Sequence, residues 1–110
     1  MDQISNLNDL RLFAEVVECG SYTAAARSLG LQTSKLSRRV RALEEELGIR
    51  LLNRTSRSLS LTETGRQFHR HCLALVAESK AAKEVIDQTR THAVLAAMRS
   101  RTDEVKRQTR

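Results

Sequence analysis

Proline is absent from this chain of 110 residues, and glycine occurs at only four positions, Gly20, Gly30, Gly48 and Gly65. Proline interrupts helices and glycine commonly ends them, so this scarcity is typical of a helical chain whose helices end at its few glycines. The glycines therefore predict the joints between a small number of helices. The sequence contains no internal repeat and no low-complexity segment.

Cysteine is nearly absent as well. Cys19 and Cys72 are far apart and outside any Cys-x-x-Cys spacing, which excludes a disulfide framework and a zinc ribbon and indicates two reduced thiols. His69, His71 and Cys72 lie close together in sequence, but structural zinc takes four ligands and there is no further cluster to supply them. We therefore expect no metal site, and we interpret Cys72 as a small buried apolar residue.

Other missing features exclude further functional classes. No apolar run approaches the roughly 18 residues of a spanning helix, and the first ten residues lack a signal-peptide pattern, so we expect a cytoplasmic protein without a membrane partner. There is no glycine-rich phosphate loop and no nucleophile with a base and an orienting group, so we expect neither an enzyme nor a cofactor. Three aromatic residues are too few for a platform that stacks single-stranded bases.

Positive charge is what the chain has in excess. Nineteen Lys and Arg residues against thirteen Asp and Glu residues give a net charge of +6, and the isoelectric point is near 10.1. Such a balance favours a polyanionic partner, above all a nucleic acid. A chain of this length forms one domain with a small core, with room for an appended arm.

The spacing of apolar residues predicts three short helices before Gly48. The first spans residues 8–19, the second begins at residue 21 or 22 and ends at 29, and the third ends at 47. The buried stripe of the third helix is formed by Leu36, Val40, Leu43 and Leu47. Three helices joined by two tight turns indicate a helix-turn-helix core.

The third helix carries its charges in an unusual order. A basic block that includes Lys35, Arg38, Arg39 and Arg41 precedes Glu44, Glu45 and Glu46. Cations are favoured near a helix C-terminus and anions near its N-terminus, so the helix dipole does not explain this order. A polyanion bound to the basic half does explain it. The glutamates then face solvent or basic groups, and one of them is expected to pair with Arg41 or Arg50.

The sequence pattern changes twice after residue 48. Residues 49–61 read as a small β-hairpin that carries Arg54 and Arg57 near its tip. A long helix is then predicted over residues 62–92, with Thr62 as its N-cap. A seam with alternating spacings of four and three predicts pairing of two chains through this helix. The seam consists of Phe68, Cys72, Leu75, Ser79, Ala82 and Ile86. Residues 93–110 are predicted to be a polar extension, either helical or frayed towards its end.

Taken in order, these motifs resemble the N-terminal DNA-binding region of LysR-type bacterial transcriptional regulators. The resemblance covers about residues 7 to 90. It rests on the Ala-Ala-Arg-x-Leu-Gly turn, the Leu-Ser-Arg recognition segment, the Leu-Glu-x-x-Leu-Gly exit, the Leu-x-x-Arg-Thr wing and the Thr-Glu-x-Gly helix start. It implies a mainly α fold, with a winged helix-turn-helix over residues 1–61, made of a three-helix core and a hairpin wing, before the long dimerisation helix.

The resemblance also implies a function. Such regulators bind pseudo-palindromic operators in double-stranded DNA as homodimers, with each recognition helix in a major groove and each wing at the neighbouring minor groove. A nucleoid-associated location in the cytoplasm follows from this function. The alternatives are an interaction module that forms mixed dimers or higher oligomers with full-length relatives through the long helix, and a basic module that binds RNA.

Individual roles follow from the match to the family motif and from side-chain chemistry. Base contacts are expected from Thr33, Ser34, Ser37 and Arg38, of which the arginine can make a bidentate contact with guanine. Contacts with phosphates or the minor groove are expected from Arg27, Ser28, Lys35, Arg39, Arg41, Arg54 and Arg57. For two residues an alternative stays open: a surface salt bridge for Arg27, and pairing with a carboxylate of the domain for Arg54.

The sequence departs from the family pattern in two places. Gln32-Thr33-Ser34-Lys35 stands where family members commonly have Ser-Gln-Pro-Ala or Ser-Pro-Ser-Ala, so we expect Thr33 to cap the recognition helix. The family also continues for roughly another two hundred residues into a domain that binds a small effector, a size that suits a separate domain. We expect no such effector domain in this chain.

Overall fold

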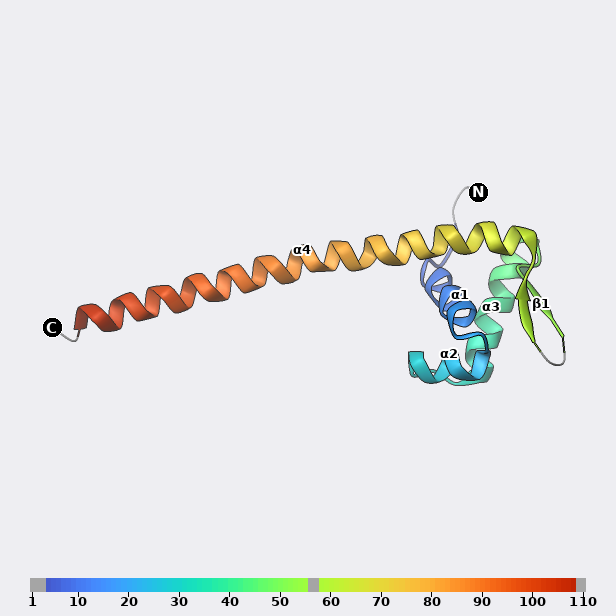
Figure 1. Cartoon of the computed structure of the whole chain (residues 1–110), viewed down its shortest axis with the longest axis horizontal. Helices are drawn as coiled ribbons and strands as arrows, with labels where there is room; N and C mark the ends of the chain where they lie inside the picture. The colour runs from blue at the N-terminus through green and yellow to red at the C-terminus, as the bar shows by residue number, and fades with distance from the viewer. Residues whose placement is uncertain (1–3, 56–57, 109–110) are drawn as a thin grey trace. The chain divides into compact units, whose positions relative to one another are not determined.

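The computed structural model describes residues 4–55 and 58–108, and the side chains up to residue 102. The elements follow the chain in the order helix, helix, helix, strand, strand, helix (Figure 1). They are α1 (Asn8–Cys19), α2 (Tyr22–Leu29), α3 (Thr33–Leu47), β1 (Leu52–Arg54), β2 (Leu59–Leu61) and α4 (Glu63–Gln108). The predicted mainly α fold, with three helices, a hairpin and a long helix, is confirmed.

The first three helices end where the glycines predict. The residues that follow them, Gly20, Gly30 and Gly48, have φ angles of 74°, 69° and 68°, in the left-handed region where a side chain is strained. The start of α2 is capped by Ser21, whose Oγ accepts a hydrogen bond from the N–H of Ala24 at 3.1 Å. The sequence thus encodes both ends of this helix through local capping.

The start of α3 differs from the expectation. Thr33 is already the first helical residue, and Gln32 stands at the N-cap with no capping bond from its side chain. The backbone carbonyl of Gln32 accepts the first helical bond, from the N–H of Leu36 at 3.0 Å. The prediction that Thr33 caps the helix was therefore wrong, because the helix begins one residue too early for it.

The hydrophobic core lies where the first three helices meet. Phe13 and Val16 of α1 and Leu36 and Val40 of α3 are fully buried, and α1 contacts both α2 and α3. Leu47, the last residue of the predicted stripe, is half-buried, and Leu43 is buried. Each buried aliphatic or aromatic side chain stabilises the unit by about 1.5–3 kcal/mol relative to its exposed state.

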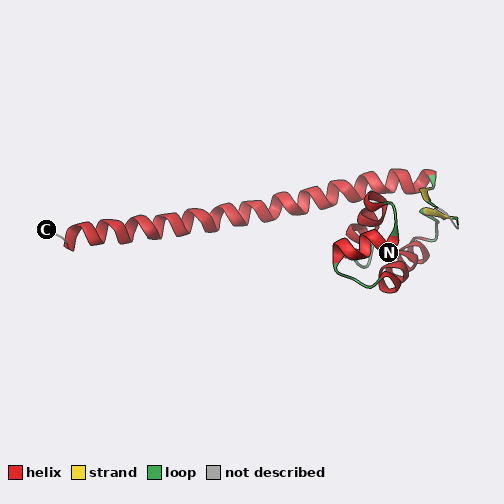
Figure 2. Cartoon of the chain, turned by 60° about the horizontal axis from the view of Figure 1, so that its bottom comes forward, coloured by secondary structure: helices red, strands yellow, loops and turns green. Residues whose placement is uncertain are grey.

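The wing connects the end of α3 to the start of α4, as the yellow hairpin in Figure 2 shows. Its two strands are antiparallel, with Leu52 opposite Leu61 and Arg54 opposite Leu59. Leu51 and Leu52 are fully buried, so the base of the hairpin belongs to the core. The predicted wing is confirmed, while Arg57 lies outside the described residues.

The chain divides into two compact units, Met1–Val76 and Ala77–Arg110. The first unit therefore includes the beginning of α4, whereas the sequence placed the boundary after residue 61. The reason is packing: Cys72 is fully buried in the core, and the ring of Phe68 lies 5.7 Å from that of Phe13. In the second unit, every side chain from residue 77 to 102 is exposed.

The helix α4 is continuous from Glu63 to Gln108, so the segment predicted as an extension from residue 93 is helical as far as 108. Thr62 caps it as predicted, since its Oγ1 accepts a hydrogen bond from the N–H of Gly65 at 2.9 Å. Within the described residues, no helix combines the length and apolarity that a membrane crossing requires.

Gly65 lies where α4 passes close to the backbone that precedes β1. A Cβ atom at this position would overlap the carbonyl oxygen of Leu51, which also accepts a hydrogen bond from the N–H of Thr62 at 3.0 Å. Only a residue without a side chain fits there.

Replacing Gly65 with alanine is expected to lower the free energy of unfolding by about 1–3 kcal/mol, because the added methyl group forces the backbone apart. Urea denaturation followed by circular dichroism measures the change. Thr64→Ala is the matched control, since Thr64 is exposed in the same helical turn and its replacement should change stability by less than about 0.5 kcal/mol. Equal midpoints for Gly65→Ala and the wild type would contradict the steric argument.

Candidate nucleic-acid interface

The helix α3 presents a polar and cationic face on the side opposite its buried stripe. Thr33, Ser34, Lys35 and Arg38 are exposed, and Ser37 is half-buried. Their orientation follows from the helical repeat, because Leu36, Val40 and Leu43 hold the other side of the helix in the core. The four residues predicted to contact bases therefore lie together near the start of one helix.

Three of the cations on α3 are free within the part of the chain that the structure describes. The side chains of Lys35, Arg38 and Arg41 take part in no ion pair or hydrogen bond there. Arg41 is also exposed, one turn beyond Arg38. Their charge is therefore available to an external anion.

Arg39 is engaged differently. Its Nη2 and Nε donate to the two carboxylate oxygens of Asp9 at 2.7 and 3.1 Å, and the Asp9 side chain is almost fully buried. The hydrogen bond to Asp9 is the main cause that raises the pKa of the Arg39 guanidinium. This bidentate pair joins α1 to α3. The phosphate contact predicted for Arg39 stays a prediction, and Asp9, its partner, lies 30 residues away in the sequence, where local pattern gives no signal of the pair.

Arg54 is held at the base of the wing by two partners. Its Nη2 donates to Oε1 of Glu44 at 2.7 Å and to the hydroxyl of Tyr22 at 3.0 Å. This is the arrangement of the open alternative, in which Arg54 pairs with a carboxylate of the domain. The expectation that one of the three glutamates pairs with Arg41 or Arg50 was wrong for the described residues: the hairpin brings Arg54 to the carboxylate of Glu44, and Glu46 accepts a hydrogen bond from the N–H of Ser5 at 3.0 Å.

Glu44 is the buried acceptor at the centre of this network. Besides Arg54, its carboxylate accepts hydrogen bonds from the backbone N–H groups of Leu51 at 2.7 Å and Leu52 at 3.2 Å. Burial acts to raise the pKa of Glu44, but these hydrogen bonds outweigh it and bring the pKa below its ordinary value of 4.5. The ionised carboxylate therefore joins α3 to the wing.

Arg27 and Ser28, the two residues of α2 that were predicted to contact DNA phosphates or the minor groove, have different surroundings. Ser28 donates its hydroxyl to Oε1 of Glu15 at 2.8 Å, whereas Arg27 is exposed in the last turn of the helix. The same oxygen of Glu15 accepts a hydrogen bond from the thiol of Cys19 at 3.3 Å. Among the described residues, Ser28 has a hydrogen-bond partner and Arg27 has none.

The predicted seam on α4 divides between the core and the surface. Cys72 is buried in the chain's own core and Phe68 packs against that core, and burial raises the pKa of the Cys72 thiol to about 11. Leu75, Ser79, Ala82 and Ile86 are exposed, as are the neighbouring Leu73 and Val85. The later members of the predicted seam are therefore not buried in the chain's own core.

His69 also packs against the core. Its ring lies edge-on to Phe13 with centroids 6.2 Å apart, and its Nε2 is 3.3 Å from Oε1 of Glu18. Among the described residues, no three His, Cys, Asp or Glu side chains are grouped in a way that would bind a metal ion.

Replacing Glu44 with glutamine is expected to lower the free energy of unfolding at pH 7 by about 2–3 kcal/mol, because Arg54 loses its ionised partner at a largely buried position. The pKa of Glu44 is lowered in the folded state, so its contribution is present above pH 4.5 and is lost as the pH falls below that value. Urea titrations from pH 7 to pH 3 should show the wild type and the variant converging at low pH.

The exposed neighbour Glu45 provides the control for this experiment. Glu45→Gln should leave stability within about 0.5 kcal/mol of the wild type at every pH. A constant gap between wild type and Glu44→Gln across this pH range would show that the ionised carboxylate is not the source of the stability.

Comparison with known proteins agrees with this fold. The model of the bacterial regulatory helix-turn-helix proteins of the lysR family matches residues 7–66. An HTH-type transcriptional regulator of Xanthomonas campestris pv. campestris (strain 8004) is 47% identical over 83 residues, which cover 76% of this chain and 24% of that protein. CrgA of Neisseria meningitidis serogroup C (strain 8013) is 47% identical over 79 residues, covering 72% and 26%.

Solved structures show the same relationship. The BenM_DBD chain in a complex with catB site 1 DNA superposes with a TM-score of 0.71 at 37% identity, covering 76% of this chain and 92% of that one. The full-length Vibrio cholerae virulence activator AphB has a TM-score of 0.68 at 42% identity, covering 74% and 28%. This chain spans about a quarter of the length of the curated relatives it matches. The chain belongs to the LysR family of bacterial helix-turn-helix regulatory proteins.

Proposed function

We propose that this chain binds double-stranded DNA in a sequence-specific manner as the DNA-binding part of a transcriptional regulator. In this proposal two chains pair and bind a pseudo-palindromic operator, each with α3 in a major groove and its wing at the adjacent minor groove. The observation that carries the proposal is the exposed face of α3, where Ser34, Arg38 and Arg41 extend from a helix whose other side is locked in the core.

Side-chain chemistry supports two roles for the residues on this face, contact with base edges and contact with phosphates. Thr33, Ser34 and Ser37 are short enough to let the helix approach base edges, and the free guanidinium of Arg38 suits the O6 and N7 atoms of guanine. Lys35 and Arg41 flank them as free cations suited to phosphates. The relative BenM_DBD has been solved in a complex with catB site 1 DNA, which supports DNA binding by this chain.

The helix α4 supports pairing of two chains. Leu75, Ala82 and Ile86 are separated by seven and four residues, so they share one helical face, and all three are exposed in the single chain. A second copy of the helix would cover this apolar surface. Phe68 and Cys72 continue the same spacing but already pack in the core, so we propose the exposed members as the interface.

The same exposed face favours a second function, pairing with longer relatives. A mixed dimer of this chain with a full-length family member would use the face that includes Ile86. Sedimentation of the chain alone and with a candidate relative separates the two functions, because only the second requires a mixed species.

Replacing Arg38 with alanine is expected to weaken binding to a duplex selected by the wild type and to relax base preference, with a cost of about 1–3 kcal/mol for one lost bidentate contact. Fluorescence anisotropy on the selected and a scrambled duplex measures both effects. Arg70→Ala, an exposed arginine on α4, is the control and should preserve the preference. If Arg38→Ala kept the wild-type affinity and preference, Arg38 would not read bases.

Replacing Ile86 with glutamate is expected to convert dimers into monomers, because the pairing face would have to bury a charge. Sedimentation equilibrium across a range of protein concentrations measures the shift. Gln88→Glu is the control, since residues two apart lie on nearly opposite sides of a helix and Gln88 is exposed. Wild-type mass for Ile86→Glu at every concentration would exclude this face as the interface.

A further inference from the structure

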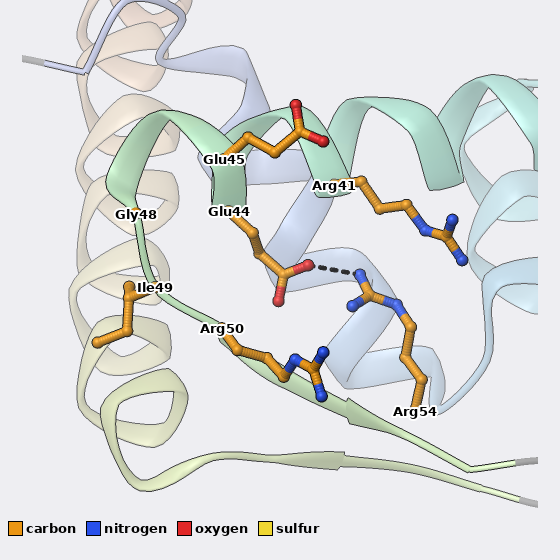
Figure 3. Close-up of a pocket in the computed structure, with 7 residues that line it drawn as sticks. All are labelled: Arg41, Glu44, Glu45, Gly48, Ile49, Arg50 and Arg54. Atoms are coloured by element: carbon orange, nitrogen blue, oxygen red, sulfur yellow. Dashed lines mark hydrogen bonds and ion pairs between the residues drawn. The ribbon is translucent and has the colours of Figure 1, made fainter.

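An open pocket of about 620 Å³ lies between the second half of α3 and the beginning of the wing. Figure 3 shows its lining, which combines three arginines with two glutamates. The lining residues are Arg41, Glu44, Glu45, Gly48, Ile49, Arg50 and Arg54. Arg50 has no role in any of the contacts proposed above, and its side chain is exposed.

Two of the three arginines in this pocket have no ion-pair partner among the described residues. Arg54 and Glu44 neutralise each other through their 2.7 Å ion pair. Within the described residues Glu45 forms no ion pair, and in Figure 3 the side chain of Arg50 extends towards Arg54. Within residues 4–55 and 58–108, the side chains of Arg41 and Arg50 take part in no ion pair or hydrogen bond. The pocket therefore offers two free guanidinium groups to an anion.

The backbone around Arg50 is held in place on both sides. Its carbonyl accepts a hydrogen bond from Oγ1 of Thr62 at 2.8 Å, and the N–H of the next residue, Leu51, donates to Glu44 at 2.7 Å. These bonds tie the connection between α3 and β1 to the core. Less conformational entropy is lost on binding when a cation is presented from a fixed backbone than from a mobile loop.

We propose that Arg50, together with Arg41, binds a phosphate of the DNA backbone in this pocket. The inference rests on the proposed function, in which α3 enters one groove and the wing lies at the next. The phosphate is one of those on the strand that separates the two grooves, because the pocket lies between the two elements that enter them. Guanidinium groups suit this ligand, since they form charge-assisted, bidentate hydrogen bonds with phosphate oxygens.

Arg50→Gln in the full chain tests the proposal, with a selected duplex of about 30 base pairs as the probe. The logarithm of the binding constant falls with the logarithm of salt concentration by about 0.9 per phosphate contact. Loss of the Arg50 contact should therefore reduce this slope by up to about 0.9 per protomer, because Arg41 still contacts the phosphate, and weaken binding by up to about 8-fold per protomer at about 0.1 M salt. The ratio of selected to scrambled affinity should not change, because a phosphate contact reads no sequence.

Two further variants separate the role of charge from other effects. Arg50→Lys retains the charge and should retain most of the salt slope. Arg70→Gln removes an exposed arginine from α4 and should leave the slope unchanged. Circular dichroism of Arg50→Gln should match the wild type, since the side chain is exposed and the hydrogen bonds of this connection come from its backbone.

The position of the phosphate is tested with duplexes that carry one uncharged methylphosphonate at each backbone position in turn. One position per half-site should weaken the wild type more than Arg50→Gln, in which only Arg41 still contacts that phosphate, and it should lie between the bases read by α3 and the minor groove at the wing. An unchanged salt slope for Arg50→Gln, or identical methylphosphonate profiles for the two proteins, would overturn the assignment. Failure of the wild type to bind any duplex would instead overturn the proposed function itself.

Discussion

The buried carboxylate of Glu44 is the interaction on which the arrangement of this molecule most depends. It accepts a hydrogen bond from Arg54 and two from backbone N–H groups that precede and begin β1, and Arg54 also reaches the hydroxyl of Tyr22. One ionised group thus joins α3, the wing and α2. A carboxylate at such a position is costly unless every oxygen is bonded, and here the bonds are strong enough to keep its pKa below the ordinary value.

This network divides the arginines into two groups with different uses. Arg39 and Arg54 pair with Asp9 and Glu44 and set the distances between elements. Arg38 and Arg41 are exposed and free within the described residues, so their charge is available to a polyanion. A DNA-binding surface needs both groups. The free cations bind phosphates, and the paired arginines keep the elements that carry those cations at fixed distances, which lowers the entropy lost on binding. The net charge of +6 alone does not reveal which arginine belongs to which group.

One sequence pattern on α4 lies in two different environments. Its apolar spacing is continuous from Phe68 to Ile86, yet the first members bury themselves in the core while the later ones are exposed. Periodicity identifies which side of a helix is apolar, but not whether the chain's own core or a second chain covers it. For that reason the sequence placed Cys72 in the seam, although the folded chain has already enclosed it.

Sequence alone determined the helices, their glycine ends, the hairpin and the exposed face of α3, because capping and apolar spacing are encoded within a few residues of each site. Only the tertiary structure decided the partners of the charged groups. Arg39 and Asp9 are 30 residues apart, and Arg54 and Tyr22 are 32 apart. Local pattern carries no information about such pairs, since they form only after the helices have packed. The same holds for Gly65. Only glycine fits at this position, because a Cβ atom would overlap the backbone carbonyl of Leu51.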